Sequence, residues 1–169
     1  MSKFVDRPSP EPVGGGEESV WQYPRPPRLE RTTARIEVVL GEATIARTSD
    51  AWRVLETSHP PNYYLPRTAF VAGSIAPSGG ASFCEFKGRA SYWTLIGGDV
   101  EVPDAAWSYE QPSTAFASIT GHLAVYAGRV DACFVDGERV IPQPGGFYGG
   151  WITAAIKGPF KGVDGSRGW

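Results

Sequence analysis

Residues 82–96 read Ser-Phe-Cys-Glu-Phe-Lys-Gly-Arg-Ala-Ser-Tyr-Trp-Thr-Leu-Ile, and this pattern indicates a β-hairpin. Lys87-Gly88 form the expected turn between a limb over residues 82–86 and a limb over residues 89–96. Side chains in the second limb alternate between the two faces of a strand, so the neighbours Tyr92 and Trp93 point in opposite directions. One ring of such a pair must therefore leave the main core and meet another part of the chain, a partner subunit or a ligand.

Further short strands are expected on both sides of this hairpin. Their close, regular spacing predicts a compact, mainly-β domain of many short antiparallel strands with one or two short helices. We expect a hairpin over residues 35–48 with its turn at Gly41-Glu42, a short helix over 51–56 ended by the prolines at 60 and 61, strands over 63–65, 69–71, 100–102, 105–109, 123–126 and 132–135, and a helical turn over 112–119.

The two ends of the chain differ from its middle. Residues 1–33 are rich in Pro, Gly and Glu and are predicted to form an extended arm, because such a segment buries little apolar surface. Trp21 and Tyr23 within it are expected to dock on the domain or on a partner subunit. The core domain is predicted over residues 34–141, and residues 142–169, rich in glycine and aromatics, as an extension packed on the core.

Composition excludes several classes of partner. The 169 residues suit one ordinary domain, and 16 basic against 18 acidic side chains give a net charge of only −2. We therefore expect no nucleic-acid and no membrane partner. No apolar stretch approaches the roughly 20 residues of a membrane span and no signal peptide is recognisable, which predicts a cytoplasmic protein. Two cysteines and two histidines without a Cys-x-x-Cys pair predict free thiols and neither metal nor other cofactor.

Four motifs occur in a fixed order in the middle of the chain: His-Pro-Pro-Asn-Tyr-Tyr-Leu-Pro at 59–66, Cys-Glu-Phe-Lys-Gly-Arg-Ala-Ser-Tyr-Trp at 84–93, Ala-Ala-Trp-Ser-Tyr at 105–109 and Gly-His-Leu-Ala-Val-Tyr at 121–126. Together they resemble the bacterial family called domain of unknown function 427. The resemblance implies a β-tent fold, the architecture of Mss4-like proteins and of the cereblon ligand-binding domain. Those relatives often hold zinc on paired Cys-x-x-Cys motifs, which this chain lacks, so zinc does not carry over.

A nucleotidyltransferase label is also attached to this family. The chain contains neither a Gly-Ser pair followed by two aspartates nor a Walker-type phosphate loop, so its residues give that label no support.

Aromatic side chains supply one half of a candidate ligand site. Rings at this density are typical of a pocket that attracts a cation or stacks on a planar ligand, and equally of a tightly packed β core. The rings that we expect to build the pocket are Tyr63, Tyr64, Trp93 and Trp107.

Polar candidates surround these rings. His59 is suited to act as a general base or ligand partner near neutral pH, and equally to cap the preceding helix. The side chains of Lys87 and Arg89 are suited to bind a carboxylate or phosphate. The common alternative is that both are solvated residues of a turn. Cys84 requires activation by a cation such as Lys87 to serve as a nucleophile, and a buried inert thiol is the alternative.

Three functions follow from these candidates. The first is a small-molecule binding domain with an aromatic pocket and polar selection by the His, Lys and Arg side chains. The second is an enzyme in which Cys84 or His59 acts on an anionic or nucleotide-like substrate steered by Lys87. The third is an interaction module, such as a homodimer, in which the exposed rings and the N-terminal arm bury against a second copy. The binding domain ranks first because no complete catalytic constellation is present.

Overall fold

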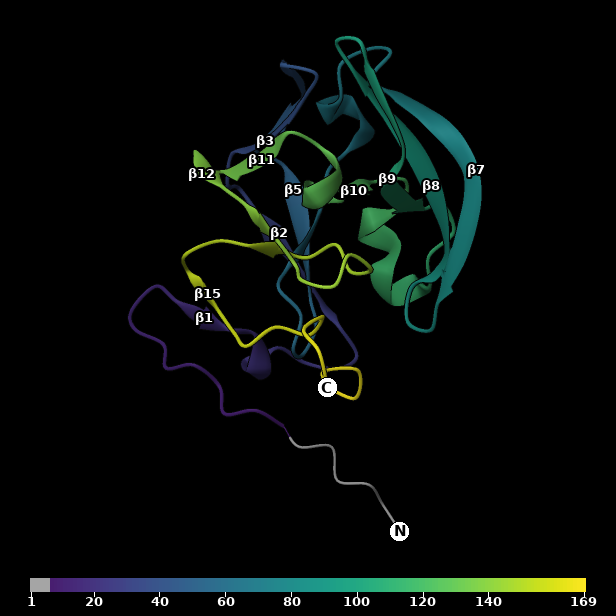
Figure 1. The fold of residues 1–169 in the computed structure, drawn as a ribbon. Coiled ribbons are helices and arrows are strands. Elements are labelled where there is room, and N and C mark those ends of the chain that lie inside the picture. Colours follow the sequence, from purple (N-terminus) through teal and green to yellow (C-terminus); the bar gives the residue numbers. More distant parts are fainter. Residues whose placement is uncertain (1–6) are drawn as a thin grey trace.

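Fifteen short strands carry most of the fold in residues 7–169, which are the residues that the computed structural model describes (Figure 1). They form five small sheets, and all but one of the strand pairs are antiparallel. The prediction of a mainly-β domain is confirmed. The helical residues of this part of the chain belong to four short 3-10 helices: η1 (Val20–Gln22), η2 (Arg67–Ala69), η3 (Thr114–Ile119) and η4 (Ala127–Arg129).

The longest strands form one curved sheet at the side of the molecule, in the order β10-β9-β8-β7 (Figure 1). The predicted hairpin at residues 82–96 is confirmed as part of it, with longer limbs than expected. Residues 100–109, predicted as two strands, form one continuous strand that accommodates Asp104 at a positive φ of 55°. The strands are β7 (Ile75–Cys84), β8 (Gly88–Gly97), β9 (Val100–Tyr109) and β10 (Leu123–Val125).

A second sheet has the order β12-β11-β3-β4 and contains the predicted hairpin at residues 35–48. Its turn meets the β8–β9 turn so closely that a Cβ on Gly41 would lie 1.9 Å from the carbonyl oxygen of Gly97. Both turns therefore require glycine at this contact. The strands are β3 (Ile36–Leu40), β4 (Ala43–Thr48), β11 (Ala132–Val135) and β12 (Glu138–Arg139).

The third sheet corrects one sequence prediction. Residues 51–56, predicted as a helix, form the central strand β5 (Ala51–Leu55) between β2 (Arg28–Thr32) and β6 (Asn62–Tyr64). A short apolar run fits either a helix or a strand covered on both faces, and pairing on both sides decides here for the strand. The strand expected at 69–71 is also wrong: Pro66 precedes η2, and only Phe70 forms a single bridge, to Ala46.

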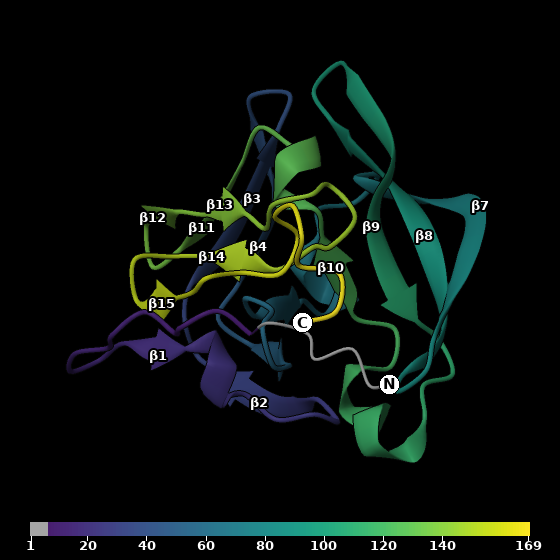
Figure 2. The ribbon, with the colours of Figure 1, turned by 60° about the horizontal axis from the view of Figure 1, so that its bottom comes forward.

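Two small strand pairs join segments near the ends of the described chain to one another. β1 (Glu18–Ser19) runs parallel to β15 (Ile156–Lys157), and β13 (Ile141–Pro142) pairs with β14 (Trp151–Ile152). Figure 2 shows these pairs on the side of the molecule away from β7–β9.

The segment predicted as an N-terminal arm contains β1, η1 and β2 within its described part. Val20 is fully buried and Tyr23 is 7% exposed, and both pack against Leu55. Arg53 of β5 forms ion pairs with Glu18 at 3.1 Å and with Glu30 at 2.6 Å. These contacts join residues 18–32 to the central strand of the third sheet.

The main core lies between the second sheet and the inner side of the β7–β10 sheet. It contains fully buried side chains from β3, β8, β10 and β14, and its members include Val38, Leu95, Leu123 and Trp151. A second cluster around Tyr64, Trp107 and Ile119 lies beside it. No helix of the described residues is long and apolar enough to cross a membrane.

Candidate functional site

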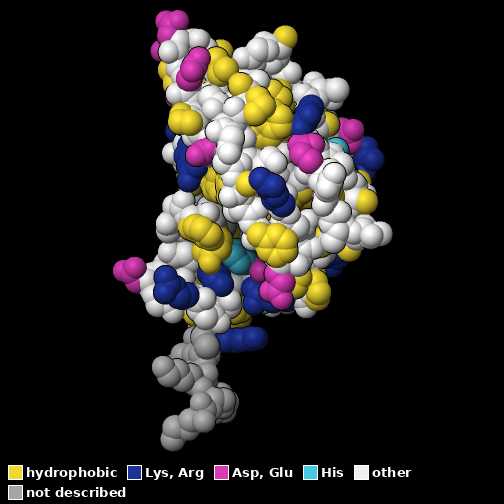
Figure 3. Space-filling model, turned by 90° about the vertical axis from the view of Figure 1, so that its right-hand side faces the viewer, with side chains coloured by type: hydrophobic (Ala, Val, Ile, Leu, Met, Phe, Trp, Pro, Cys, Tyr) yellow, Lys and Arg dark blue, Asp and Glu magenta, His cyan; other side chains and the backbone are white. Residues whose placement is uncertain are grey.

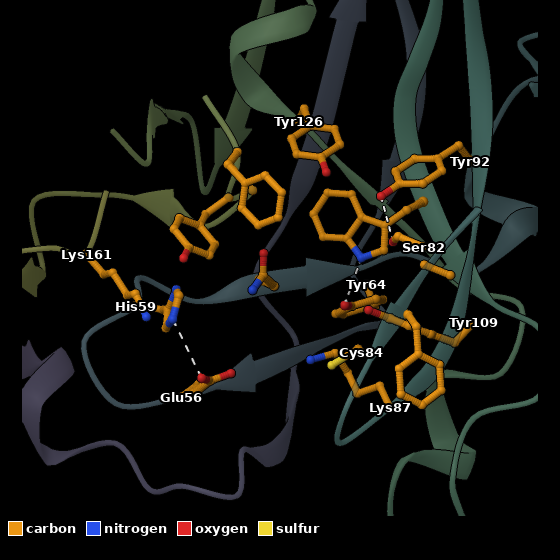
Figure 4. Close-up of a pocket in the computed structure, with 17 residues that line it drawn as sticks. Glu56, His59, Tyr64, Ser82, Cys84, Lys87, Tyr92, Tyr109, Tyr126 and Lys161 are labelled. Atoms are coloured by element: carbon orange, nitrogen blue, oxygen red, sulfur yellow. Dashed lines mark hydrogen bonds and ion pairs between the residues drawn. The ribbon is translucent and has the colours of Figure 1, made fainter. Parts of the chain in front are cut away.

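A pocket of about 310 Å³ lies over the second core cluster (Figure 4). Strand alternation explains its walls, because side chains two residues apart share one face of a strand. Alternating positions of four strands face it: Asn62 and Tyr64 of β6, Ser82 and Cys84 of β7, Ala90 and Tyr92 of β8, and Trp107 and Tyr109 of β9.

The aromatic wall is held by ring contacts and one buried hydrogen bond. The indole Nε1 of Trp107 donates to the Tyr64 hydroxyl at 3.1 Å, and the two rings meet edge to face with centroids 6.2 Å apart. Tyr126 lies against the other side of Trp107, at 4.5 Å. Burial raises the pKa of Tyr64 and raises that of Tyr126 to about 12. These phenols therefore stay neutral at physiological pH and present an apolar wall with hydroxyl groups.

Lys87 lies at one end of the pocket, beside Cys84 (Figure 4). Lys87 is only 7% exposed, and among residues 7–169 no carboxylate forms an ion pair with its ammonium group. The Nζ atom lies over the rings of Tyr109 and Phe116, each with its centroid 5.8 Å away. A buried cation without a counter-ion is costly, so this ammonium group is available to an anion that enters the pocket.

The position of Lys87 is set by its turn. Gly88 follows it with φ of 100°, a conformation that glycine adopts without strain. Ser113, at the start of η3, donates its hydroxyl to the carbonyl of Phe86 at 2.6 Å and its amide to that of Lys87 at 3.3 Å. The turn is therefore anchored, and Lys87 projects from a fixed backbone.

His59 lies at the other end, near Glu56 and Lys161 (Figure 4). The tautomer of His59 follows from its neighbour Gln143. The Gln143 Oε1 accepts a hydrogen bond from the amide of Gly150 at 3.0 Å, so the Gln143 Nε2 must donate on the opposite side. That Nε2 donates to His59 Nδ1 at 3.0 Å and to the Lys161 carbonyl at 2.9 Å. Nδ1 is therefore the acceptor nitrogen, and the proton of the neutral ring is on Nε2.

The protonation state of His59 agrees with this arrangement. Burial is the main influence and outweighs the nearby Glu56, with the Lys161 charge adding to it, so the pKa of His59 falls to about 4. Its Nε2 lies 3.6 Å from Glu56 Oε2, and its ring meets that of Tyr148 edge to face at 4.9 Å. At neutral pH the pocket thus has an uncharged imidazole N–H donor at this end.

Residues beyond β13 form one wall of the pocket: Phe147, Tyr148, Gly149 and Lys161. A Cβ on Gly149 would lie 2.2 Å from Cη2 of Trp107, and one on Gly150 would lie 2.6 Å from the carbonyl oxygen of Pro60. The backbone of this segment therefore lies directly against the aromatic wall, and only glycine permits the approach.

Cys84 is half-buried and has a free thiol. The pKa of Tyr109 is raised, first by burial and then by the neighbouring Tyr64 hydroxyl and Cys84 thiol. The Cys84 thiol therefore lies beside the Tyr109 phenol. No hydrogen bond joins Cys84 to His59 in the described chain, and Figure 4 shows them at opposite ends of the pocket. The second cysteine, Cys133, is 1% exposed in the main core, where burial raises its pKa.

The structure brings five of the eight sequence-predicted site residues into this pocket. They are His59, Tyr64, Cys84, Lys87 and Trp107. The pocket lies within the part of the chain that the structure describes, where no group of three or more His, Cys, Asp or Glu side chains is placed to hold a metal ion.

The other three lie elsewhere because of strand alternation. Tyr63 points from β6 into the main core, where it stacks on Trp151 at 5.0 Å. Arg89 and Trp93 lie on the opposite face of β8 in a separate, shallow groove. There the Arg67 guanidinium covers the Trp93 ring at 4.6 Å.

Sequence reasoning missed other lining residues. Asn62 was detectable, since it stands two positions before Tyr64; its Oδ1 is buried and has no hydrogen-bond partner among the described residues. Tyr92 and Tyr109 were detectable in the same way, as neighbours by alternation. The C-terminal residues gave no local signal, because long-range strand pairs bring them to the site.

Comparison with known families matches residues 28–136 to a family described as Domain of unknown function (DUF427). This covers more than half of the chain, so the protein belongs to that family, and the resemblance seen in its motifs is confirmed. A search of curated proteins found no match. The match ends before Gln143, so the C-terminal wall of the pocket lies outside the matched region.

Proposed function

We propose that this member of the DUF427 family binds a small organic anion in the aromatic pocket, with the anionic group at Lys87 and a planar, apolar body against the tyrosine and tryptophan wall. The observation that carries the proposal is the burial of Lys87 without a carboxylate partner in the described residues. Lysines are rarely buried unless they are paired, and an anionic ligand would provide the missing charge.

The remaining wall supports the same ligand class. The rings of Tyr64, Tyr92 and Trp107 offer apolar faces with hydroxyl groups at their edges, and the neutral His59 adds a donor at the far end. Such a mixture of apolar surface and a few fixed polar groups is typical of small-molecule sites. The pocket is of a size that accepts one or two fused rings with a carboxylate, sulfonate or phosphate.

Thermal melting against a panel of compounds tests the proposal. The panel contains aryl carboxylates, aryl sulfonates, nucleotides and, as the opposite charge class, aryl quaternary amines. A ligand at a hundred times its dissociation constant adds about 2.7 kcal/mol to the free energy of unfolding. For this chain length that raises the midpoint by several degrees, at roughly 2–4 °C per kcal/mol.

Lys87→Met is the diagnostic variant, and Lys157→Met is its matched control. Lys157 is a surface lysine that pairs with Glu17 at 3.3 Å and does not line the pocket. We expect shifts for planar anions that disappear in Lys87→Met and persist in Lys157→Met. Shifts confined to cationic arenes, or equal in both variants, would contradict the proposal.

An enzymatic role is the second candidate, and it is favoured by one observation: Cys84 and Lys87 line the same end of the pocket. In that case the Cys84 thiol would lose its proton to water, attack an acyl carbon of the bound anion and expel the acyl leaving group to form a thioester, and water would then hydrolyse the thioester to restore the thiol. The variant Cys84→Ser distinguishes a binding protein from an enzyme. Both hypotheses predict that it keeps its affinity for the anion, and the enzymatic hypothesis also predicts that it loses turnover.

A further inference from the structure

The end of the pocket opposite Lys87 has a second lysine. Lys161 lines the pocket, and Figure 4 shows it beside His59, away from Lys87. Its Nζ donates to the main-chain carbonyl of Trp169 at 3.2 Å and lies over the ring of Tyr148, whose centroid is 5.7 Å away. Among residues 7–169 no Asp or Glu side chain forms an ion pair with Lys161. The pocket therefore has an ammonium group at each end.

Positive charge exceeds negative charge at the Lys161 end. Glu56 is the one acidic side chain of the described residues that lines the pocket, and its Oε2 is already paired with Arg25 at 3.1 Å. Burial lowers the pKa of Lys161, and the positive charge of Arg25 lowers it further by more than Glu56 raises it. Repulsion between the two cations thus outweighs attraction to the acid, and an anion bound here would relieve that repulsion.

His59 supplies an unused hydrogen-bond donor at the same end. The proton of its neutral ring is on Nε2, because Nδ1 accepts from Gln143. That Nε2 lies 3.6 Å from Glu56 Oε2, which is longer than a hydrogen bond, and it has no hydrogen-bond acceptor among residues 7–169. His59 is only 8% exposed, and a buried donor without a partner is unfavourable. The imidazole N–H is therefore available to a ligand group that also reaches Lys161.

From these observations we infer that the ligand is a dianion, with its two anionic groups at opposite ends of a planar body. The first group lies at Lys87, the body lies against the tyrosine and tryptophan wall, and the second group accepts hydrogen bonds from Lys161 Nζ and His59 Nε2. This inference rests on the proposed function and adds the second recognition group of the ligand. Aryl dicarboxylates, and aryl phosphates that also have a carboxylate, belong to this class.

The outer surface favours a small dianion over a polyanion. Figure 3 shows the side of the molecule on which β7 lies, where basic and acidic side chains are interspersed without one large basic area. The whole chain has a net charge of −2. A polyanion such as nucleic acid requires an extended basic surface, whereas two ammonium groups in one cavity of about 310 Å³ suit a compact molecule with two charges.

Isothermal titration calorimetry with arenes that have one or two sulfonates tests the inference. Naphthalene-2-sulfonate supplies one anionic group and the planar body, and the 2,6- and 2,7-disulfonates add a second group at two different angles. The titrations are made in about 0.15 M salt, which screens long-range attraction. We expect the wild-type protein to bind at least one disulfonate about tenfold more tightly than the monosulfonate, because hydrogen bonds between charged groups are among the strongest polar contacts.

Lys161→Met is the diagnostic variant, and Lys157→Met is its matched control, because it removes the same charge outside the pocket. The preference for the disulfonate should fall to about twofold or less in Lys161→Met and should persist in Lys157→Met. Lys161→Arg keeps the positive charge and should retain most of the preference. If circular dichroism shows that Lys161→Met does not fold, Lys161→Gln replaces it, since glutamine keeps a donor for the Trp169 carbonyl.

The outcomes separate the inference from the proposed function. If naphthalene-2-sulfonate binds in a Lys87-dependent way but neither disulfonate is preferred, or if the preference persists in Lys161→Met, the dianion inference is wrong and the proposed function stands. If Lys157→Met loses the preference as Lys161→Met does, the preference reflects overall charge and the inference is overturned. If none of the three arenes binds, or if Lys87→Met binds them as well as wild type, the proposed function itself fails.

Discussion

Replacement of Lys87 by methionine should increase the stability of the protein while it removes the affinity for anions. Methionine has nearly the volume of the lysine stem and no charge to bury. Lys87 is 7% exposed without an ion-pair partner in the described chain, so the substitution relieves the desolvation of an unpaired ammonium group. A residue kept only for packing would show the opposite stability change.

The magnitude follows from two opposing contributions. Relief of desolvation should add about 1–2 kcal/mol to the free energy of unfolding. The rings of Tyr109 and Phe116 lie 5.8 Å from Nζ, near the outer limit of cation–π contact, so their loss subtracts at most about 1 kcal/mol. The net change is expected between about zero and +2 kcal/mol, or up to roughly 4–8 °C in the melting midpoint.

The affinity change is larger and has the opposite sign. A hydrogen bond between ions contributes about 1.5–3 kcal/mol, so the dissociation constant for naphthalene-2-sulfonate should rise about 10- to 150-fold. Melting by circular dichroism and calorimetric titration measure the two effects on the same sample. A variant destabilised by more than about 1 kcal/mol with unchanged affinity would refute this reasoning and make Lys87 a structural residue.

Three further predictions concern the walls of the pocket. The pKa of about 4 for His59 lies below its unfolded value near 6.5, so stability that is present above pH 6.5 should fall as the pH drops toward 4, by up to about 3 kcal/mol, and this loss should be smaller in His59→Gln when unfolding is measured against pH. Gly149→Ala should destabilise the protein by about 1–3 kcal/mol in urea unfolding and change tryptophan fluorescence, because the new Cβ overlaps the Trp107 ring. A thiol reagent should label Cys84 and spare Cys133 in the folded protein, and a bound anion should slow the labelling.

Each of these has a result that would contradict it. An equal pH dependence in wild type and His59→Gln would mean that carboxylates alone cause the loss. Gly15→Ala, at a glycine with open space around it, is the control for the glycine substitution, and equal effects at Gly15 and Gly149 would remove the packing argument. Labelling of Cys133 at the rate of Cys84 would show that the core opens on the timescale of the reagent.

Much of the fold and part of the site were predictable because they depend on local pattern. Alternation in β8 predicted that Tyr92 and Trp93 point to opposite faces, as they do. The same rule, carried through β6, would have separated Tyr64 from Tyr63. The hairpins at residues 35–48 and 82–96 followed from glycines that suit positive φ, and the turn of the second lies at residues 85–87, slightly earlier than the predicted 87–88.

The rest depends on long-range pairing, which local pattern does not encode. β5 is a strand because β2 and β6 pair with it on both sides, although its residues alone suit a helix. Tyr148 and Lys161 reach the pocket through the pairs β13–β14 and β1–β15, and Gln143 reaches His59 across 84 positions of sequence. These parts of the site become visible only when the strands are assembled.

The central claim, that Lys87 meets an anion in this pocket, is tested most directly by nuclear magnetic resonance on protein with lysines labelled at 13Cε. The chain has four lysines, at positions 3, 87, 157 and 161, so each signal is assigned by one substitution. On titration with naphthalene-2-sulfonate, the account predicts a saturable shift of the Lys87 signal while that of Lys157 stays in place. A Lys87 signal that does not move, or that moves only as much as the Lys157 signal, would contradict it.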